Sequence, residues 1–203
     1  MSYVEMNMFA PRIWGFDRGD TEMRVAREAG WSRADLVWER LTEAGCAAYV
    51  AGDRAGAARM LRRAGWVARL FFGAQDMRRA TSLANLAVQA RDAGQGARAE
   101  ALQKQALNLW RRAPEMVGGI VFKPRSRSSL FHLRMEALHR DTFHDNMRKR
   151  YRAIAAESDQ ALRRLLVGAR PERPICARWR GEKPPVFDDG RKFLAAALLI
   201  AEG

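Results

Sequence analysis

LTEAGCAAYVAGDRAGAARMLRRA, residues 41–64, and LANLAVQARDAGQGARAEALQKQA, residues 83–106, share one spacing of small and apolar residues. The matching positions are Leu41, Ala44, Gly45, Ala48, Gly52, Ala57, Leu61 and Ala64 in the first copy and Leu83, Leu86, Ala87, Ala90, Gly94, Ala99, Gln103 and Ala106 in the second. Small residues at helical intervals on both sides of a glycine predict two helices that meet closely across a short turn. A doubled unit of this kind predicts stacked helical hairpins.

The periodicity predicts four helices, over residues 33–50, 54–72, 76–92 and 97–112. Gly52, Gly73 and Gly94 are their expected stops, and Pro114 follows the last one. The predicted inner face of the first helix is Leu36, Leu41, Ala44 and Ala48, and that of the second is Ala57, Leu61, Ala64, Val67 and Leu70. Short joints make these helices two antiparallel hairpins.

The doubled unit, about residues 33–114, resembles the tetratricopeptide repeat family, whose helix-turn-helix pattern is W-x2-L-G-x2-Y, A-x3-F and P. The small and apolar positions match, but Gln103 replaces the aromatic residue of the second helix, neither copy has the Trp or Tyr of the first helix, and the period is 42 residues from Leu41 to Leu83. The resemblance implies a superhelix whose concave face receives a peptide or a partner helix. Two repeats are fewer than such stacks usually need, so the rest of the chain is expected to complete the fold.

The predicted organisation has four parts in an all-α fold. Residues 1–32 form an N-terminal arm and a short helix from Asp20 or Thr21 to Gly30, and residues 33–114 form the hairpins. Residues 115–169 form a basic helical extension that includes an amphipathic stretch over 146–167. Residues 170–203 contain a Pro- and Arg-rich connector and a last helix over 191–201, whose apolar length predicts docking on the body.

The chain is strongly basic, with a net charge of +13 from 36 Lys and Arg residues against 23 Asp and Glu residues. Most of the basic residues are arginines, which hold carboxylates and phosphates in a bidentate fork, although a GC-rich genome also favours arginine. A charge of this size attracts an acidic protein, a nucleic acid or an anionic membrane. The excess is concentrated in the second half of the chain.

Targeting and redox features predict a cytoplasmic protein. The N-terminus shows no export signal, and no apolar run reaches the length of a membrane span. Cys46 and Cys176 stand far apart and form no CxxC motif. Cys46 lies among Gly45, Ala47 and Ala48, which predicts a small buried thiol.

Candidate catalytic and metal-binding residues are few. His132, Glu136 and His139 have the i, i+4, i+7 spacing that places them on one helical face, where they are a weak candidate for a divalent metal. Arg134 and Arg140 disfavour a cation there. No nucleophile with a neighbouring base and no phosphate-binding glycine loop is found. The chain is therefore expected to be neither an enzyme nor a cofactor protein.

The sequence favours a protein-interaction module, such as an adaptor, an assembly factor or an accessory subunit, that binds a partner protein with an acidic surface. The candidate partner-binding residues are Arg62, Arg63, Arg98 and Lys104 in the repeats and Arg148, Arg150, Arg152, Arg178, Trp179 and Arg180 beyond them. Two alternatives stay open. One is RNA or DNA binding by the Arg-rich half, and the other is a metal-binding accessory subunit of an enzyme.

Overall fold

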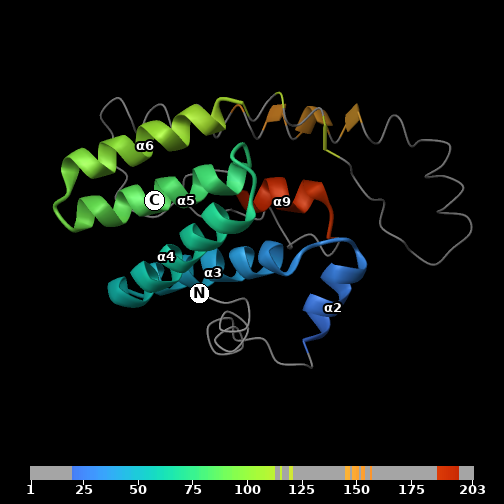
Figure 1. Cartoon of the computed structure of the whole chain (residues 1–203), viewed down its shortest axis with the longest axis horizontal. Helices are drawn as coiled ribbons and strands as arrows, with labels where there is room; N and C mark the ends of the chain where they lie inside the picture. Colours follow the sequence, from blue (N-terminus) through green and yellow to red (C-terminus); the bar gives the residue numbers. More distant parts are fainter. Residues whose placement is uncertain are drawn as a thin grey trace, which may run out of the picture.

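The structure is a computed structural model that describes residues 20–112, 115, 119–120, 145–146, 148–150, 152–153, 156 and 187–196. Its regular elements within these residues are helices, which confirms the all-α class. None of the described helices combines the length and the apolar character that crossing a membrane requires. Figure 1 shows the helices in order along the chain.

The elements are α2 (Thr21–Glu28), α3 (Arg33–Val50), α4 (Arg54–Phe71), α5 (Met77–Asp92), α6 (Gly96–Trp110) and α9 (Asp189–Ala196). The four repeat helices α3 to α6 begin and end within two residues of their predicted limits. Side chains cap α2, α3, α4 and α5, because those of Asp20, Ser32, Asp53 and Asp76 each accept a hydrogen bond from a backbone N–H of the first turn. These local signals explain why the sequence located the helices well.

The turns of the two hairpins use equivalent residues of the two sequence copies. Gly52 has φ +85° between α3 and α4, and Gly94 has φ +73° between α5 and α6. A residue with a side chain rarely adopts this left-handed conformation, so glycine ends each first helix and lets the chain reverse. The repeated spacing therefore encodes a repeated turn.

Two other glycines allow the helices to approach each other closely. A Cβ atom at Gly45 of α3 would lie 2.7 Å from Cγ of Leu61 in α4. A Cβ atom at Gly65 of α4 would lie 3.1 Å from Cδ1 of Leu86 in α5. Since α4 makes both contacts, it joins the first hairpin to the second.

The buried row of α3 differs from the predicted one at Ala44, which is exposed. Thr42, Gly45 and Tyr49 are buried instead, at intervals of three and four residues. Ala44 is one position before Gly45, about 100° away around the helix, and this rotation turns its methyl group to solvent. The expectation that Ala44 lies on the inner face was wrong.

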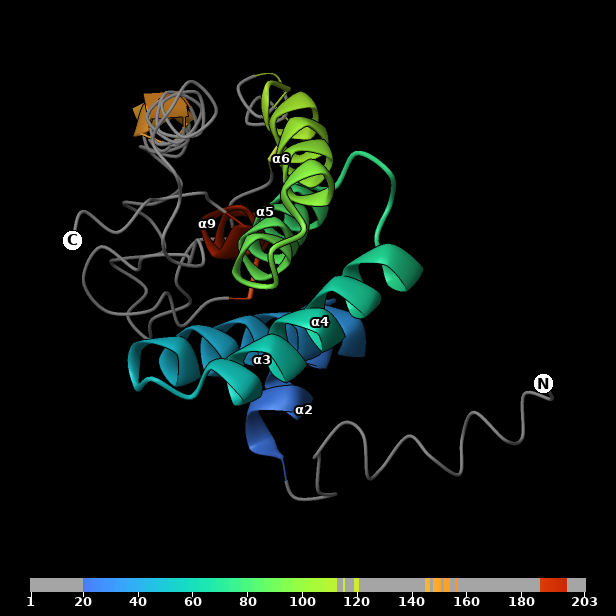
Figure 2. The ribbon, with the colours of Figure 1, turned by 90° about the vertical axis from the view of Figure 1, so that its left-hand side faces the viewer.

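Helix α9 packs beside α5, far from it in sequence (Figures 1 and 2). The Phe193 ring stacks on the Trp110 ring with centroids 5.9 Å apart, and Phe187, just before α9, meets Trp31 edge-on at 5.0 Å. These rings belong to the same apolar cluster as Leu36 and Trp38 of α3. The end of the described chain thus completes the core that the hairpins begin.

Candidate interaction surface on α4

Helix α4 has one buried side and one outer face that is both basic and apolar. Ala57, Leu61, Ala64 and Ala68 are buried, and the buried row continues to Phe72 just after the helix. The outer face carries exposed side chains of two kinds, namely the arginines Arg59, Arg62, Arg63 and Arg69 and the apolar residues Trp66 and Leu70. We call these six residues the α4 outer face.

Leu70 was expected on the inner face of this helix, and the structure corrects that expectation. Its side chain is 64% exposed. Because Val67 and Ala68 already fill the inward positions of that turn, the next inward position comes four residues after Ala68, at Phe72. Leu70 is thereby turned to the outside.

Trp66 is the central residue of the α4 outer face, and it is not among the residues predicted from the sequence to bind a partner. Its side chain is 67% exposed and lies one helical turn before Leu70. A large exposed apolar pair rimmed by charged residues is typical of an interaction site. The sequence does contain a signal for this face. Trp66 follows Arg62 by four residues and Arg63 by three, on a helix that has no Asp or Glu.

The charge of α4 is entirely positive. The helix contains five arginines, Arg54 and the four of the outer face, and no Asp or Glu. Within the described part of the chain, the ion pairs that we observe involve other basic residues. The positive charges of the α4 outer face are therefore exposed and form no ion pair with a carboxylate of the described residues.

A hollow of about 250 Å³ lies beside the first half of α4. It lies between the two hairpins, because its lining comes from both of them. Residues from α3, α4 and α5 and the following turn line it: Tyr49, Arg54, Ala57, Ala58, Leu61, Arg62, Val88, Gln89, Asp92 and Ala93. Arg62 belongs both to this hollow and to the α4 outer face, so the two features are continuous.

Those remaining predicted site residues that the structure describes lie on other elements than α4. Arg98 and Lys104 are exposed on α6, and α5 lies between α6 and α4 in Figure 2. The backbone is helical at Arg148, Arg150 and Arg152, and Nη1 of Arg148 lies 3.5 Å from Oδ1 of Asp145. Arg178, Trp179 and Arg180 lie outside the described residues. Of the predicted set, Arg62 and Arg63 are the two that the structure brings together with Trp66.

The predicted metal residues His132, Glu136 and His139 also lie outside the described residues. Among the residues that are described, no group of three or more His, Cys, Asp or Glu side chains is arranged to hold a metal ion. The metal site therefore stays a prediction from sequence spacing.

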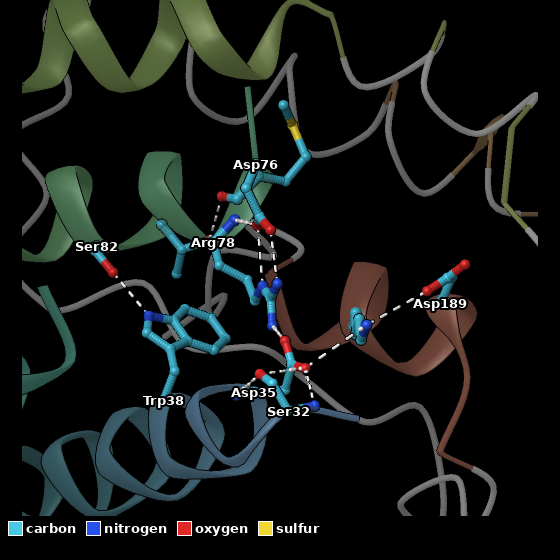
Figure 3. A network of polar contacts seen from close by, with 10 residues as sticks. Ser32, Asp35, Trp38, Asp76, Arg78, Ser82 and Asp189 are labelled. Atoms are coloured by element: carbon cyan, nitrogen blue, oxygen red, sulfur yellow. Dashed lines mark hydrogen bonds and ion pairs between the residues drawn. The ribbon is translucent and has the colours of Figure 1, made fainter. Parts of the chain in front are cut away.

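A second cluster of charged groups is buried between α3, α5 and α9. In Figure 3 the guanidinium of Arg78 lies between the carboxylates of Asp76 and Asp35, and Trp38 Nε1 donates to Ser82 Oγ at 2.9 Å. Asp35 also accepts from the Ser32 backbone N–H and hydroxyl. Since each charge here has an opposite partner, this cluster is well suited to hold helices together.

The electrostatics of the buried cluster keep it ionised. Burial raises the pKa of Asp35, but the charge and hydrogen bond of Arg78 outweigh this effect, so the pKa lies below its usual value. Burial lowers the pKa of Arg78, and Asp76 and Asp35 more than compensate, so its pKa is raised. Groups held in one charge state in this way are poor proton donors and acceptors near neutral pH.

Cys46 is buried, as expected, but it is not a thiol. It is disulfide-bonded, which corrects the prediction from its neighbours. The other cysteine of the chain, Cys176, lies outside the described residues. Disulfides are typical of oxidising compartments, so the cytoplasmic location receives no support from this cysteine and stays a prediction.

Comparisons with protein families, with curated proteins and with solved structures found no match to this chain. The tetratricopeptide resemblance accordingly stays a prediction from the doubled spacing.

Proposed function

We propose that this chain is a non-enzymatic protein-interaction module, acting as an adaptor, an assembly factor or an accessory subunit, and that it binds an acidic partner protein on the α4 outer face. The observation that carries the proposal is the exposure of Trp66 among arginines that no described carboxylate neutralises. Trp and Arg are the residue types that most often dominate the energy of protein interfaces. The acidic character of the partner follows from charge complementarity.

The arrangement of the outer face supports a protein partner over an anionic membrane. A helix that lies in a membrane surface separates its apolar side from its charged side. On α4 the arginines Arg62, Arg63 and Arg69 surround Trp66 on the same face. Such mixed surroundings suit a partner whose carboxylates and apolar side chains alternate at short range.

Nucleic acid would stack its bases on open aromatic faces. The Tyr49 ring in the neighbouring hollow is covered by the Arg54 guanidinium, whose Cζ atom is 3.6 Å from the ring centroid. Leu70 offers an aliphatic contact rather than a stacking surface. Trp66 is the one aromatic residue of the α4 outer face and its ring is open, so the crosslinking test at position 66 distinguishes a protein partner from a nucleic acid.

Photo-crosslinking in the native cell tests the proposal. A photoreactive benzoylphenylalanine at position 66 is expected to give a nuclease-resistant protein adduct, and the partner peptide that carries the crosslink is expected to be rich in Asp and Glu. The matched control places the same group at Asn108, which is exposed on α6. The Asn108 derivative should not give this adduct.

Charge reversal supplies the second arm of the test. The double variant Arg63→Glu/Arg69→Glu should abolish the adduct, whereas Arg98→Glu/Lys104→Glu, with the same change in net charge on α6, should retain it. An adduct with nucleic acid or lipid in place of protein would contradict the proposal. So would a protein adduct that the α6 double variant loses as completely as the α4 one.

A further inference from the structure

The hollow beside α4 has an apolar floor and the size of a side-chain site. Ala57, Leu61 and Val88 are buried where they line it. Pockets for cofactors and drug-sized ligands usually measure about 300–1,000 Å³, and this one is smaller, at about 250 Å³. Its dimensions suit one aliphatic side chain better than a free cofactor.

The charged groups that line the hollow are mainly positive. The guanidinium groups of Arg54 and Arg62 add two positive charges against the single carboxylate of Asp92. An incoming oxygen with negative charge would satisfy this set.

The hollow and the exposed apolar residues form one continuous row along α4. Ala58 and Arg62 line the hollow, and Trp66 and Leu70 follow at the same interval of four residues. Residues at this interval lie one above another on a helix surface. A single segment of a partner can therefore contact the hollow and the α4 outer face together.

We infer that the hollow is an anchor site for a leucine-like side chain that has a carboxylate beside it, supplied by the acidic partner. The alkyl group lies on Ala57, Leu61 and Val88, and the carboxylate pairs with Arg62. The source of this group in the partner rests on the proposed function. The chemistry of the hollow can be tested separately from it.

The probe is 4-methylpentanoate, which carries a leucine-like alkyl group and a carboxylate. Titration of the full chain, followed by NMR, should give saturable shifts of the Val88 methyl groups and of the Gln89 side-chain amide. A fragment of this size should bind with a dissociation constant on the order of 1–20 mM. The neutral analogue 4-methylpentanamide should bind about two- to five-fold more weakly, because it lacks the charge that Arg62 recognises.

Two alanines of α4 provide matched variants. Ala58→Phe fills the hollow and should abolish the shifts, whereas Ala55→Phe places the same ring on an exposed position outside the hollow and should leave them. If Ala58→Phe disturbs the fold, Arg62→Gln tests the site without adding volume. The Arg62→Gln chain should bind 4-methylpentanoate no more tightly than 4-methylpentanamide.

The inference is overturned if the folded wild-type chain shows no saturable shifts at Val88 and Gln89, or if Ala58→Phe leaves them unchanged. The two proposals can fail independently. A protein adduct at position 66 without probe binding would remove the anchor site and leave the proposed function. Probe binding without any protein adduct would remove the partner as the source of the anchor and the proposed function with it.

Discussion

Arg191 of α9 and Glu39 of α3 form an ion pair that is almost completely buried, with Nη2 2.6 Å from Oε1 and side-chain exposures of 3% and 2%. Arg191 Nε donates to the other oxygen of the same carboxylate at 3.2 Å, so the contact is bidentate. Its Nη2 is also 3.3 Å from Glu22 of α2. One side chain thus connects three helices, two of which lie at the beginning of the described chain.

Removing Arg191 should destabilise the fold strongly, because the buried carboxylate of Glu39 would lose its bidentate partner. We expect Arg191→Ala to lower the free energy of unfolding by about 3–5 kcal/mol, measured by urea denaturation. The neighbouring Lys192→Ala removes a half-exposed amine and should cost at most about 1 kcal/mol. The double variant Arg191→Met/Glu39→Met should recover most of the loss, because it leaves no lone charge. Equal losses for Arg191→Ala and Lys192→Ala would show that the pair is not a critical contact.

The close approach of α3 and α4 predicts that a single methyl group at Gly45 is harmful. Gly45→Ala should lower the free energy of unfolding by about 1–3 kcal/mol, because the new Cβ would overlap with Leu61. Gly96→Ala is the matched control, since it is also helical and nothing lies near its Cβ position. That change should stabilise the chain by about 0.4–1 kcal/mol. Thermal unfolding that ranks the two variants in the opposite order would contradict the packing described at Gly45.

Acid should weaken the attachment of α2 to α3. The hydrogen bond from Arg40 lowers the pKa of Asp20 to about 2 from its usual 3.8, and Asp35 is shifted in the same direction. A carboxyl whose pKa is lower in the folded chain stabilises it above the unfolded pKa, and this contribution is lost as the pH falls from about 4 to about 2. Asp20→Asn preserves the helix cap and should flatten that part of the pH profile. An Asp20 carboxyl that titrates near 3.8 by NMR in the folded chain would refute the prediction.

The hairpins were predictable because their signals are local. Helix limits follow from caps such as Ser32 and from Gly52 and Gly94, all within a few residues of the helix they end or begin. The pairing of Arg191 with Glu39 spans 152 residues, and no short-range pattern reveals it. Long-range contacts of this kind decide which charges are buried.

The α4 outer face was only half predictable. The arginines Arg62 and Arg63 were selected by charge, which is visible in the sequence. Trp66 was overlooked and Leu70 was placed inside, because apolar residues are usually assigned to a core. Which apolar residue of a turn is buried depends on the neighbours that already fill the interior, here Val67 and Ala68.

Leu61 and Leu70, nine residues apart on α4, should therefore differ strongly in how much the same substitution lowers the stability of the fold. Leu61→Ala removes a side chain that is 1% exposed and should cost about 2–5 kcal/mol of folding stability. Leu70→Ala should change stability by less than about 0.5 kcal/mol, because its side chain is mostly in solvent. In the crosslinking assay at position 66, Leu70→Ala should reduce the yield of the partner adduct although the chain is fully folded. A Leu70→Ala chain that loses stability as Leu61→Ala does would place Leu70 back in the core and remove half of the apolar contact proposed for the partner.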